Sequence, residues 1–132
     1  MTNKRGHASV VFDEASFDAD TKKGNAAGAD VARAARRAYE CDGVPSDDLR
    51  RCEAEGSDGT LLPHCLKVYM PPPAGRFGMV FQLEIVDGRG RLRYLAFGIR
   101  HHPRGSTART VYQIAHRRLH ADLGKMAAFP SG

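Results

Sequence analysis

Arginine, histidine and tyrosine side chains gather between residues 98 and 112, where the chain reads GIRHHPRGSTARTVY. A guanidinium group binds phosphate oxygens through paired hydrogen bonds and keeps its charge. Imidazole transfers protons near neutral pH, which a guanidinium does poorly. Such side chains, brought together, have the chemistry to bind and cleave a phosphodiester. The candidates in this stretch are Arg100, His101, His102, Arg104, Arg109 and Tyr112.

Each of these residues also has a structural interpretation, and the sequence leaves the choice open. A tyrosine at a helix start can stack on a base or donate a proton, but it can equally pack onto a sheet. Arg117 and Arg118 extend the cationic set, although arginines are also common on the surfaces of basic proteins. The set as a whole therefore carries more information than any member.

Metal and cofactor chemistry lack supporting patterns. Adjacent histidines at a strand end, His101 and His102, point apart, and with His64 and Cys65 they form no zinc-binding Cys-x2-Cys pattern. Cys65 is either a structural cysteine or half of a Cys–His nucleophilic pair. No glycine-rich phosphate loop stands between a strand and a helix. The sequence thus predicts no metal and no cofactor.

The chain length of 132 residues fits a single domain over residues 1–132, with flexible tails expected at 1–7 and 126–132. Twenty lysines and arginines against fifteen aspartates and glutamates give a net charge of +5, which favours anionic partners. Residues 89–118 hold eight arginines and no carboxylate, so the positive charge is concentrated in the C-terminal third.

Cysteine usage and hydropathy indicate the compartment. Cys41, Cys52 and Cys65 form no Cys-x-x-Cys pair and follow no signal-peptide pattern, which predicts reduced thiols in the cytoplasm. No stretch approaches the roughly 20 apolar residues of a membrane span. We therefore expect a cytoplasmic protein with no membrane partner.

Apolar periodicity predicts an α+β domain. The expected elements are a strand at 8–12, helices at 16–23 and 28–41, a loop region at 42–64 with one short helix near 47–52, strands at 66–70, 79–86 and 92–100, and a helix from 110 to about 124. Residues 87–90 predict a hairpin turn. Thr110 and Gln113 form a capping box for the last helix. This order predicts an N-terminal strand and helical hairpin, then helices on one face of a mainly antiparallel sheet.

Alternation along the strands separates two faces. The predicted core face carries Leu66, Val68, Met70, Met79, Phe81, Leu83, Ile85, Leu95, Phe97 and Ile99. The opposite face carries Lys67, Tyr69, Gln82, Glu84, Tyr94, Ala96, Gly98 and Arg100. Ala96 and Gly98 are small, which favours a groove beside the cations. The alternative is that this is only the solvated side of the sheet.

Four motifs follow one another along the chain: VVFDEASFDAD, HCLKVYM, GRFGMVFQLE, and LAFGIRHHP followed by TVY. With these motifs, the chain from Ser9 to Leu119 resembles the RelE/ParE superfamily of bacterial toxins, small basic partners of toxin–antitoxin pairs. The resemblance implies a RelE-like fold, and the family's order of elements is the order predicted above.

The RNA-cleaving branch implies an endoribonuclease that cuts mRNA on the ribosome without a metal. Lys67, Arg100 and Tyr112 match catalytic positions of the family, and His101 or His102 would transfer protons. The expected RNA-binding residues are Tyr69, Arg76, Arg104, Arg109 and Arg117. The expected partners are mRNA, the ribosome and an acidic antitoxin protein.

Three departures from the family pattern keep two other functions open. Tyr69 stands where many members carry a cation, Gly78 stands at the position of a central-strand arginine, and the loop between Arg100 and Tyr112 is long. These differences affect catalysis more than fold. The alternatives are a ParE-like toxin that binds gyrase and a non-catalytic interaction module of the same fold.

Overall fold

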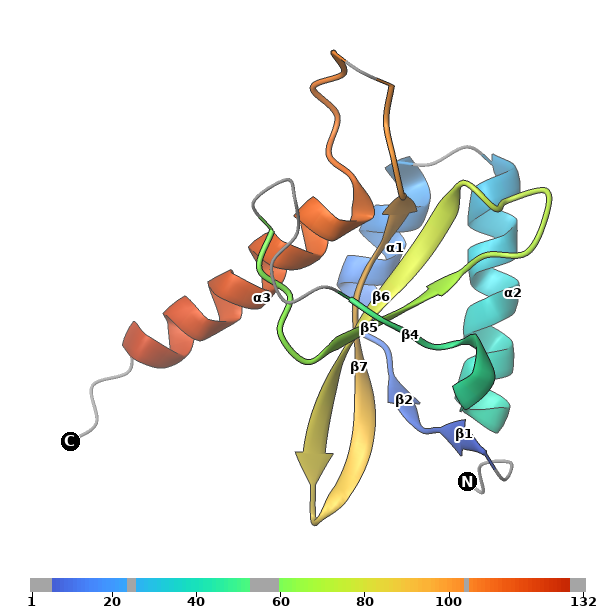
Figure 1. Cartoon of the computed structure of the whole chain (residues 1–132). Coiled ribbons are helices and arrows are strands. Elements are labelled where there is room, and N and C mark those ends of the chain that lie inside the picture. The colour runs from blue at the N-terminus through green and yellow to red at the C-terminus, as the bar shows by residue number, and fades with distance from the viewer. Residues whose placement is uncertain (1–5, 24–25, 53–59, 104, 129–132) are drawn as a thin grey trace.

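The computed structural model describes residues 6–23, 26–52, 60–103 and 105–128 (Figure 1). The elements are β1 (His7–Ala8), β2 (Val10–Val11), α1 (Glu14–Lys23), α2 (Ala26–Asp42), β3 (Val44–Pro45), a 3₁₀ turn (Ser46–Asp48), β4 (Arg50–Arg51), β5 (Cys65–Tyr69), β6 (Phe77–Val86), β7 (Arg89–Ile99) and α3 (Val111–Ala128). The α+β class is as predicted. Among the described residues, every helix is too short or too polar to cross a bilayer.

The main sheet has five strands in the order β2-β7-β6-β5-β4. Within the described residues, β2 runs parallel to its neighbour β7 and the other three pairings of this sheet are antiparallel, so the prediction of a mainly antiparallel sheet is confirmed. The single strand expected at 8–12 is divided, because β1 pairs with β3 in a separate two-stranded sheet. The short helix expected near 47–52 is a 3₁₀ turn followed by the edge strand β4.

Regular elements extend into both expected tails. Strand β1 begins at His7, and α3 continues to Ala128. Residues 1–5 and 129–132 lie outside the described residues.

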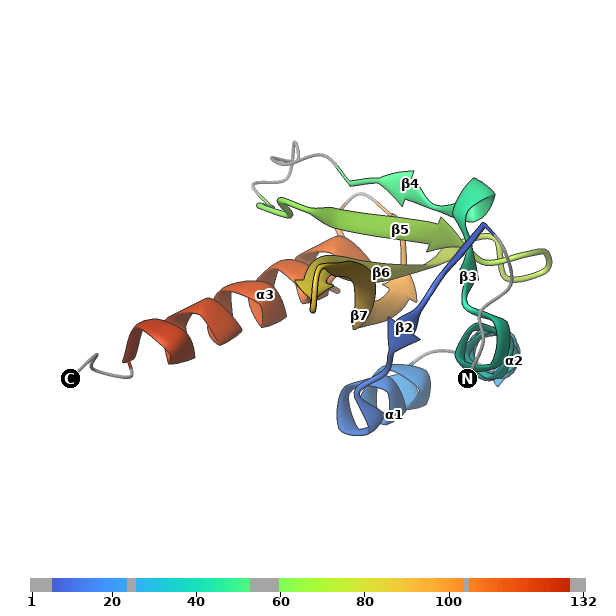
Figure 2. The same cartoon turned by 90° about the horizontal axis from the view of Figure 1, so that it is seen from below.

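Helices cover both faces of the sheet, so the prediction of helices on one face was wrong. Figure 2 shows α2 and α3 flanking the sheet from opposite sides. The first core cluster joins Ala32 of α2 to sheet residues such as Val68 and Met79. The second joins α3 to the reverse side of β6 and β7, through Val80, Leu95, Ala96, Val111, Ala115 and Leu119. The reverse side is apolar enough to bury a helix of its own.

A β-bulge changes the predicted alternation of β7. Val80 pairs with Ala96 but Phe81 pairs with Tyr94, which leaves Leu95 as an extra residue. Tyr94 is therefore buried with Phe97 in the first core cluster, whereas Leu95 packs in the second. Both assignments reverse the prediction, because strict alternation assumes an unbroken ladder.

The β6–β7 hairpin extends beyond the helices, and its tip lies far from them in Figure 1. Leu83 is 42% exposed and Ile85 is 70% exposed, so their assignment to the core was wrong. Asp87 and Gly88 both adopt positive φ, at 53° and 77°, as a tight two-residue hairpin turn requires.

The capping box of α3 is confirmed. The Thr110 N–H donates to Gln113 Oε1 at 2.9 Å, and the Gln113 N–H donates to Thr110 Oγ1 at 3.2 Å. Helix α3 consequently starts at Val111 and carries Tyr112 in its first turn. Gly98 lies directly under this turn, because a Cβ there would meet the Cα of Val111 at 3.7 Å. The groove expected over Gly98 is thus partly filled by α3.

A buried ion pair joins α1, β7 and α3. Asp20, whose side chain is 1% exposed, accepts hydrogen bonds from both Nη atoms of Arg118 at 2.7 Å. It also accepts from the Tyr94 hydroxyl at 2.6 Å and the Phe97 N–H at 3.1 Å. Burial, and then the Asp20 charge, raises the pKa of Tyr94, so this hydroxyl remains a donor.

Replacing Asp20 by Asn should destabilise the fold strongly. The substitution leaves Arg118 partly buried without its counter-charge, and breaking a buried pair in this way costs about 3 kcal/mol or more. Urea denaturation measures the loss in free energy of unfolding. Asp18→Asn on the same helix is the control, since Asp18 pairs with Lys22 in an exposed ion pair, and loss of this pair should cost less than about 1 kcal/mol. Equal losses would contradict the assigned role of Asp20.

Candidate functional site

Six basic and aromatic side chains meet on the face of the sheet that also carries α3. This Tyr69 cluster consists of Arg50, Lys67, Tyr69, Arg100, His101 and Tyr112. Lys67 and Tyr69 share a face because they are two residues apart on β5. Arg50 on β4 pairs directly opposite Lys67. Arg100 follows β7, and Tyr112 belongs to the first turn of α3.

Cation–π contacts connect the members of the cluster. The Arg100 guanidinium carbon lies 3.8 Å from the centre of the Tyr69 ring, and that of Arg50 lies 4.9 Å from it. The Lys67 Nζ lies 5.7 Å from Tyr69 and 5.0 Å from the Tyr112 ring. The His101 and Tyr112 ring centres are 6.3 Å apart. The negative ring faces offset the mutual repulsion of three neighbouring cations.

Gly78 and Gly75 position Arg100. A Cβ at residue 78 would meet the Arg100 Cγ at 3.1 Å, so the absence of a side chain lets Arg100 cross β6 toward Tyr69. Arg100 Nη1 donates to the Gly75 carbonyl at 2.9 Å. The Nε atom is buried and has no acceptor among the described residues. Packing, more than charge pairing, therefore holds the guanidinium in place.

The cluster is electropositive. Within the described part of the chain, no carboxylate forms an ion pair with Arg50, Lys67 or Arg100. Elsewhere arginines are neutralised, as Arg91 is by Glu84 at 2.6 Å. An anion that binds to Arg50, Lys67 or Arg100 therefore does not have to displace a carboxylate of the described residues.

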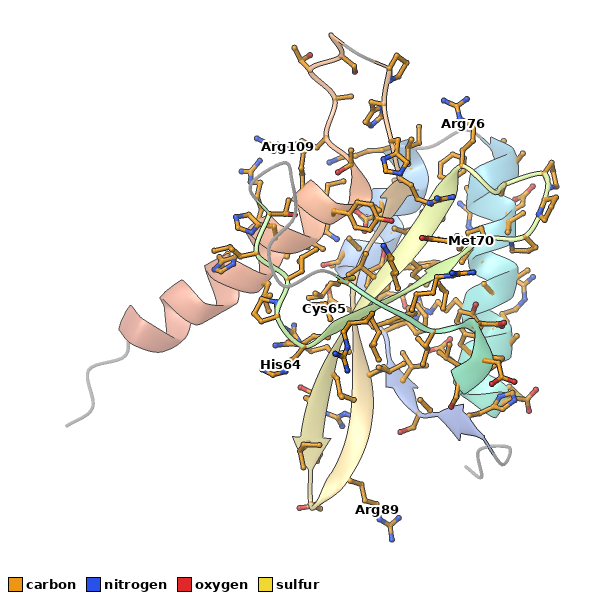
Figure 3. All side chains as sticks on the ribbon, viewed as in Figure 1. His64, Cys65, Met70, Arg76, Arg89 and Arg109 are labelled. Atoms are coloured by element: carbon orange, nitrogen blue, oxygen red, sulfur yellow. The ribbon has the colours of Figure 1, made fainter. Side chains whose placement is uncertain are left out.

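Five of the predicted site residues come together: Lys67, Tyr69, Arg100, His101 and Tyr112. His102 turns away, and its Nε2 lies 2.8 Å from the Arg109 carbonyl oxygen. Arg109 and Arg117 line a hollow on the other side of α3. Arg76 is exposed and lies well apart from Arg109 in Figure 3. Arg104 lies outside the described residues.

Arg50 is a member of the cluster that the sequence analysis did not identify. Its position depends on the pairing of β4 with β5, in which Arg50 lies opposite Lys67, a residue 17 positions further along the chain. The local signal, two arginines after a turn, gave no reason to prefer a strand over the expected short helix.

Cys52 and Cys65 are buried, which is typical of structural cysteines. Burial raises the pKa of Cys52 to about 11 and that of Cys65 to about 12, so both thiols are protonated at neutral pH. Cys65, labelled in Figure 3, is the first residue of β5 and is buried. This environment disfavours the nucleophilic interpretation of Cys65.

His116 and His120 hold the segment before β5 onto α3. The Leu61 N–H donates to His116 Nδ1 at 2.8 Å, and His120 Nε2 lies 3.1 Å from the Leu61 carbonyl oxygen. Over the described residues, no group of three or more histidine, cysteine or carboxylate side chains is arranged to hold a metal ion.

Comparison with protein-family models, curated proteins and solved structures found no match for this chain. Function is therefore inferred from the chemistry of the site.

Gly78→Ala should displace Arg100 from Tyr69, because the added methyl group occupies the path of the Arg100 side chain. Ring currents of Tyr69 shift the Arg100 side-chain protons upfield in NMR spectra, and this shift should be lost. Gly90→Ala is the matched control, since its Cβ meets only Leu83 Cδ1 at an ordinary 3.5 Å. An unchanged Arg100 signal in the Gly78 variant would refute the proposed positioning.

Cys41 should be alkylated well before Cys52 and Cys65 in the native protein. Cys41 is exposed, whereas the other two thiols are buried with raised pKa values. Mass spectrometry after iodoacetamide treatment at pH 8 measures the order, and denaturant should make all three react. Fast native labelling of Cys65 would reopen its candidacy as a nucleophile.

Proposed function

We propose that this protein is a RelE-like toxin that cleaves mRNA on the ribosome as an endoribonuclease. The observation that carries the proposal is the meeting of Lys67, Arg100, His101 and Tyr112 on one electropositive face. The order strand, two helices, antiparallel strands and helix supports it further, because the family resemblance implies the same order. Such a toxin acts in the cytoplasm.

The cluster suits attack by a ribose 2′-hydroxyl. In this reaction the 2′-oxygen forms a bond to the adjacent phosphorus and loses its proton to a base. The bond from phosphorus to the 5′-oxygen breaks, and an acid protonates that oxygen. The products are a 2′,3′-cyclic phosphate and a 5′-hydroxyl. The nucleophile belongs to the RNA, so the protein supplies only proton transfer and charge stabilisation.

Roles follow from the positions of the side chains. Arg100 and Lys67 stabilise the negative charge of the pentavalent transition state. His101 exchanges protons, and Tyr112, beside both Lys67 and His101, donates a hydrogen bond or stacks on a base. Tyr69 is contacted by three cations and serves to position them. An acidic antitoxin would inhibit the protein by covering this face.

A non-catalytic, ParE-like function is the second candidate. Arg100 already donates to the Gly75 carbonyl, and its Nε is buried, which leaves fewer donors for a phosphate. His102 is also directed away from the cluster. In that case the cluster would bind a protein such as gyrase, and the purified protein would inhibit supercoiling without cutting RNA.

Cleavage should depend on the cluster and not on total charge. In a purified translation system, mapping of mRNA ends should show cuts on ribosomes, and mass spectrometry should find cyclic phosphate ends. Removing an oxyanion-stabilising or proton-transferring group costs about 10²-fold or more in rate. We expect such losses for Lys67→Ala, Arg100→Lys and His101→Gln, and a smaller loss for Tyr112→Phe.

Arg89→Gln is the matched control, because Arg89 is exposed at the tip of the β6–β7 hairpin, at the opposite end of the molecule from Arg76 in Figure 3. It should retain full activity. Wild-type protein that leaves mRNA intact but blocks gyrase supercoiling would favour the ParE-like function. Inactivity in both assays would favour an interaction module.

A further inference from the structure

A hollow of about 710 Å³ lies on the side of α3 opposite the Tyr69 cluster. Its walls are the end of α1, the end of β7, residues of the loop between His102 and Arg109, and α3 residues such as Ile114 and Arg117. None of the six residues of the Tyr69 cluster lines it. The volume is within the range of about 300–1,000 Å³ that is common for small-molecule sites.

One wall of the hollow is the edge of β7 beyond the end of its pairing with β2. The pairing of β2 with β7 ends at Arg93. Beyond it, the Arg100 N–H donates toward β6, to the Arg76 carbonyl, whereas the Phe97 N–H donates away from β6, to Asp20. Backbone groups alternate in an antiparallel ladder, so the Phe97 carbonyl and the Ile99 N–H also point away from β6. The edge offers an acceptor beside a donor.

The rim of the hollow is cationic. Lys23, Arg109 and Arg117 line it from three different elements, and none forms an ion pair with a carboxylate within the described residues. Asp20 also lines the hollow, but Arg118 neutralises it. The contact between His102 and the Arg109 carbonyl ties the two ends of the loop together. Phosphate groups fit such a rim.

Apolar side chains complete the lining. Phe77, Ile99 and Ile114 contribute to the walls between the strand edge and the rim. A flat ring can pack against them with one edge toward the backbone. Nucleobases combine such a ring with a hydrogen-bond donor beside an acceptor, and nucleotides add phosphates at the other end.

We propose that this hollow binds a nucleotide. The base edge pairs with the Phe97 carbonyl and the Ile99 N–H, and the phosphates contact Lys23, Arg109 and Arg117. The nucleotide is either free or the phosphorylated 5′ end of an RNA strand, since both present the same chemistry. The site is separate from the Tyr69 cluster and does not depend on RNA cleavage there.

Calorimetric titration and NMR test the proposal with four probes: ATP, adenosine, tripolyphosphate and a 5′-phosphorylated trinucleotide. ATP should bind about tenfold or more tightly than adenosine or tripolyphosphate, because each lacks one half of the contacts. The Ile99 amide signal should shift on binding. A trinucleotide that binds as tightly as ATP identifies an RNA end as the ligand, and weaker binding identifies a free nucleotide.

Variants separate this site from the Tyr69 cluster. Arg117→Gln and Ala121→Glu change exposed positions at the rim and should each weaken ATP binding about tenfold. Arg89→Gln and Lys67→Ala should leave it unchanged. Equal affinity for ATP and tripolyphosphate would overturn the proposal. Shifts at Lys67 and Tyr69 without one at Ile99 would overturn it too, and would assign the anion to the cluster.

Discussion

The carboxylate of Asp20 lies against the part of β7 that follows Arg93, where the edge strand β2 has ended. Beyond Arg93, β7 has no strand neighbour on that side within the described residues, yet its edge lies beneath two helices. Asp20 accepts from the Phe97 N–H, and Arg118 donates to the Leu95 carbonyl at 2.7 Å. One ion pair thus satisfies backbone groups that burial would otherwise penalise. It also fixes α1 and α3 against the same strand.

This constraint determines where the Tyr69 cluster and the hollow lie. Because α3 is held across β7, its first turn comes down beside β5, which brings Tyr112 to 5.0 Å from the Lys67 ammonium group. The opposite side of the same helix directs Arg117 into the hollow beside α1. Helix α3 therefore separates two electropositive surfaces, and a loss of the Asp20–Arg118 pair would disturb both.

Local patterns predicted the elements well but not how they are layered. Period-two alternation located β5 to β7, and the Thr110 capping box located the start of α3, since both signals depend on neighbouring residues. The bulge at Leu95 and the edge strand carrying Arg50 depend on pairing across the sheet. The sequence analysis also predicted a groove over Ala96 and Gly98, whereas in the structure α3 packs against these small residues.

Gly78 illustrates how side chains from neighbouring strands can occupy the space that a small residue leaves. Judged from the motif alone, glycine at this position removes a cation from the centre of the site. In the structure, the space it leaves is crossed by Arg100 from the adjacent strand, while Arg50 approaches Tyr69 from the other edge of the sheet. Positive charge at the cluster is set by which side chains can reach Tyr69. Reach depends on the size of the residues between the strands as much as on the positions of the arginines.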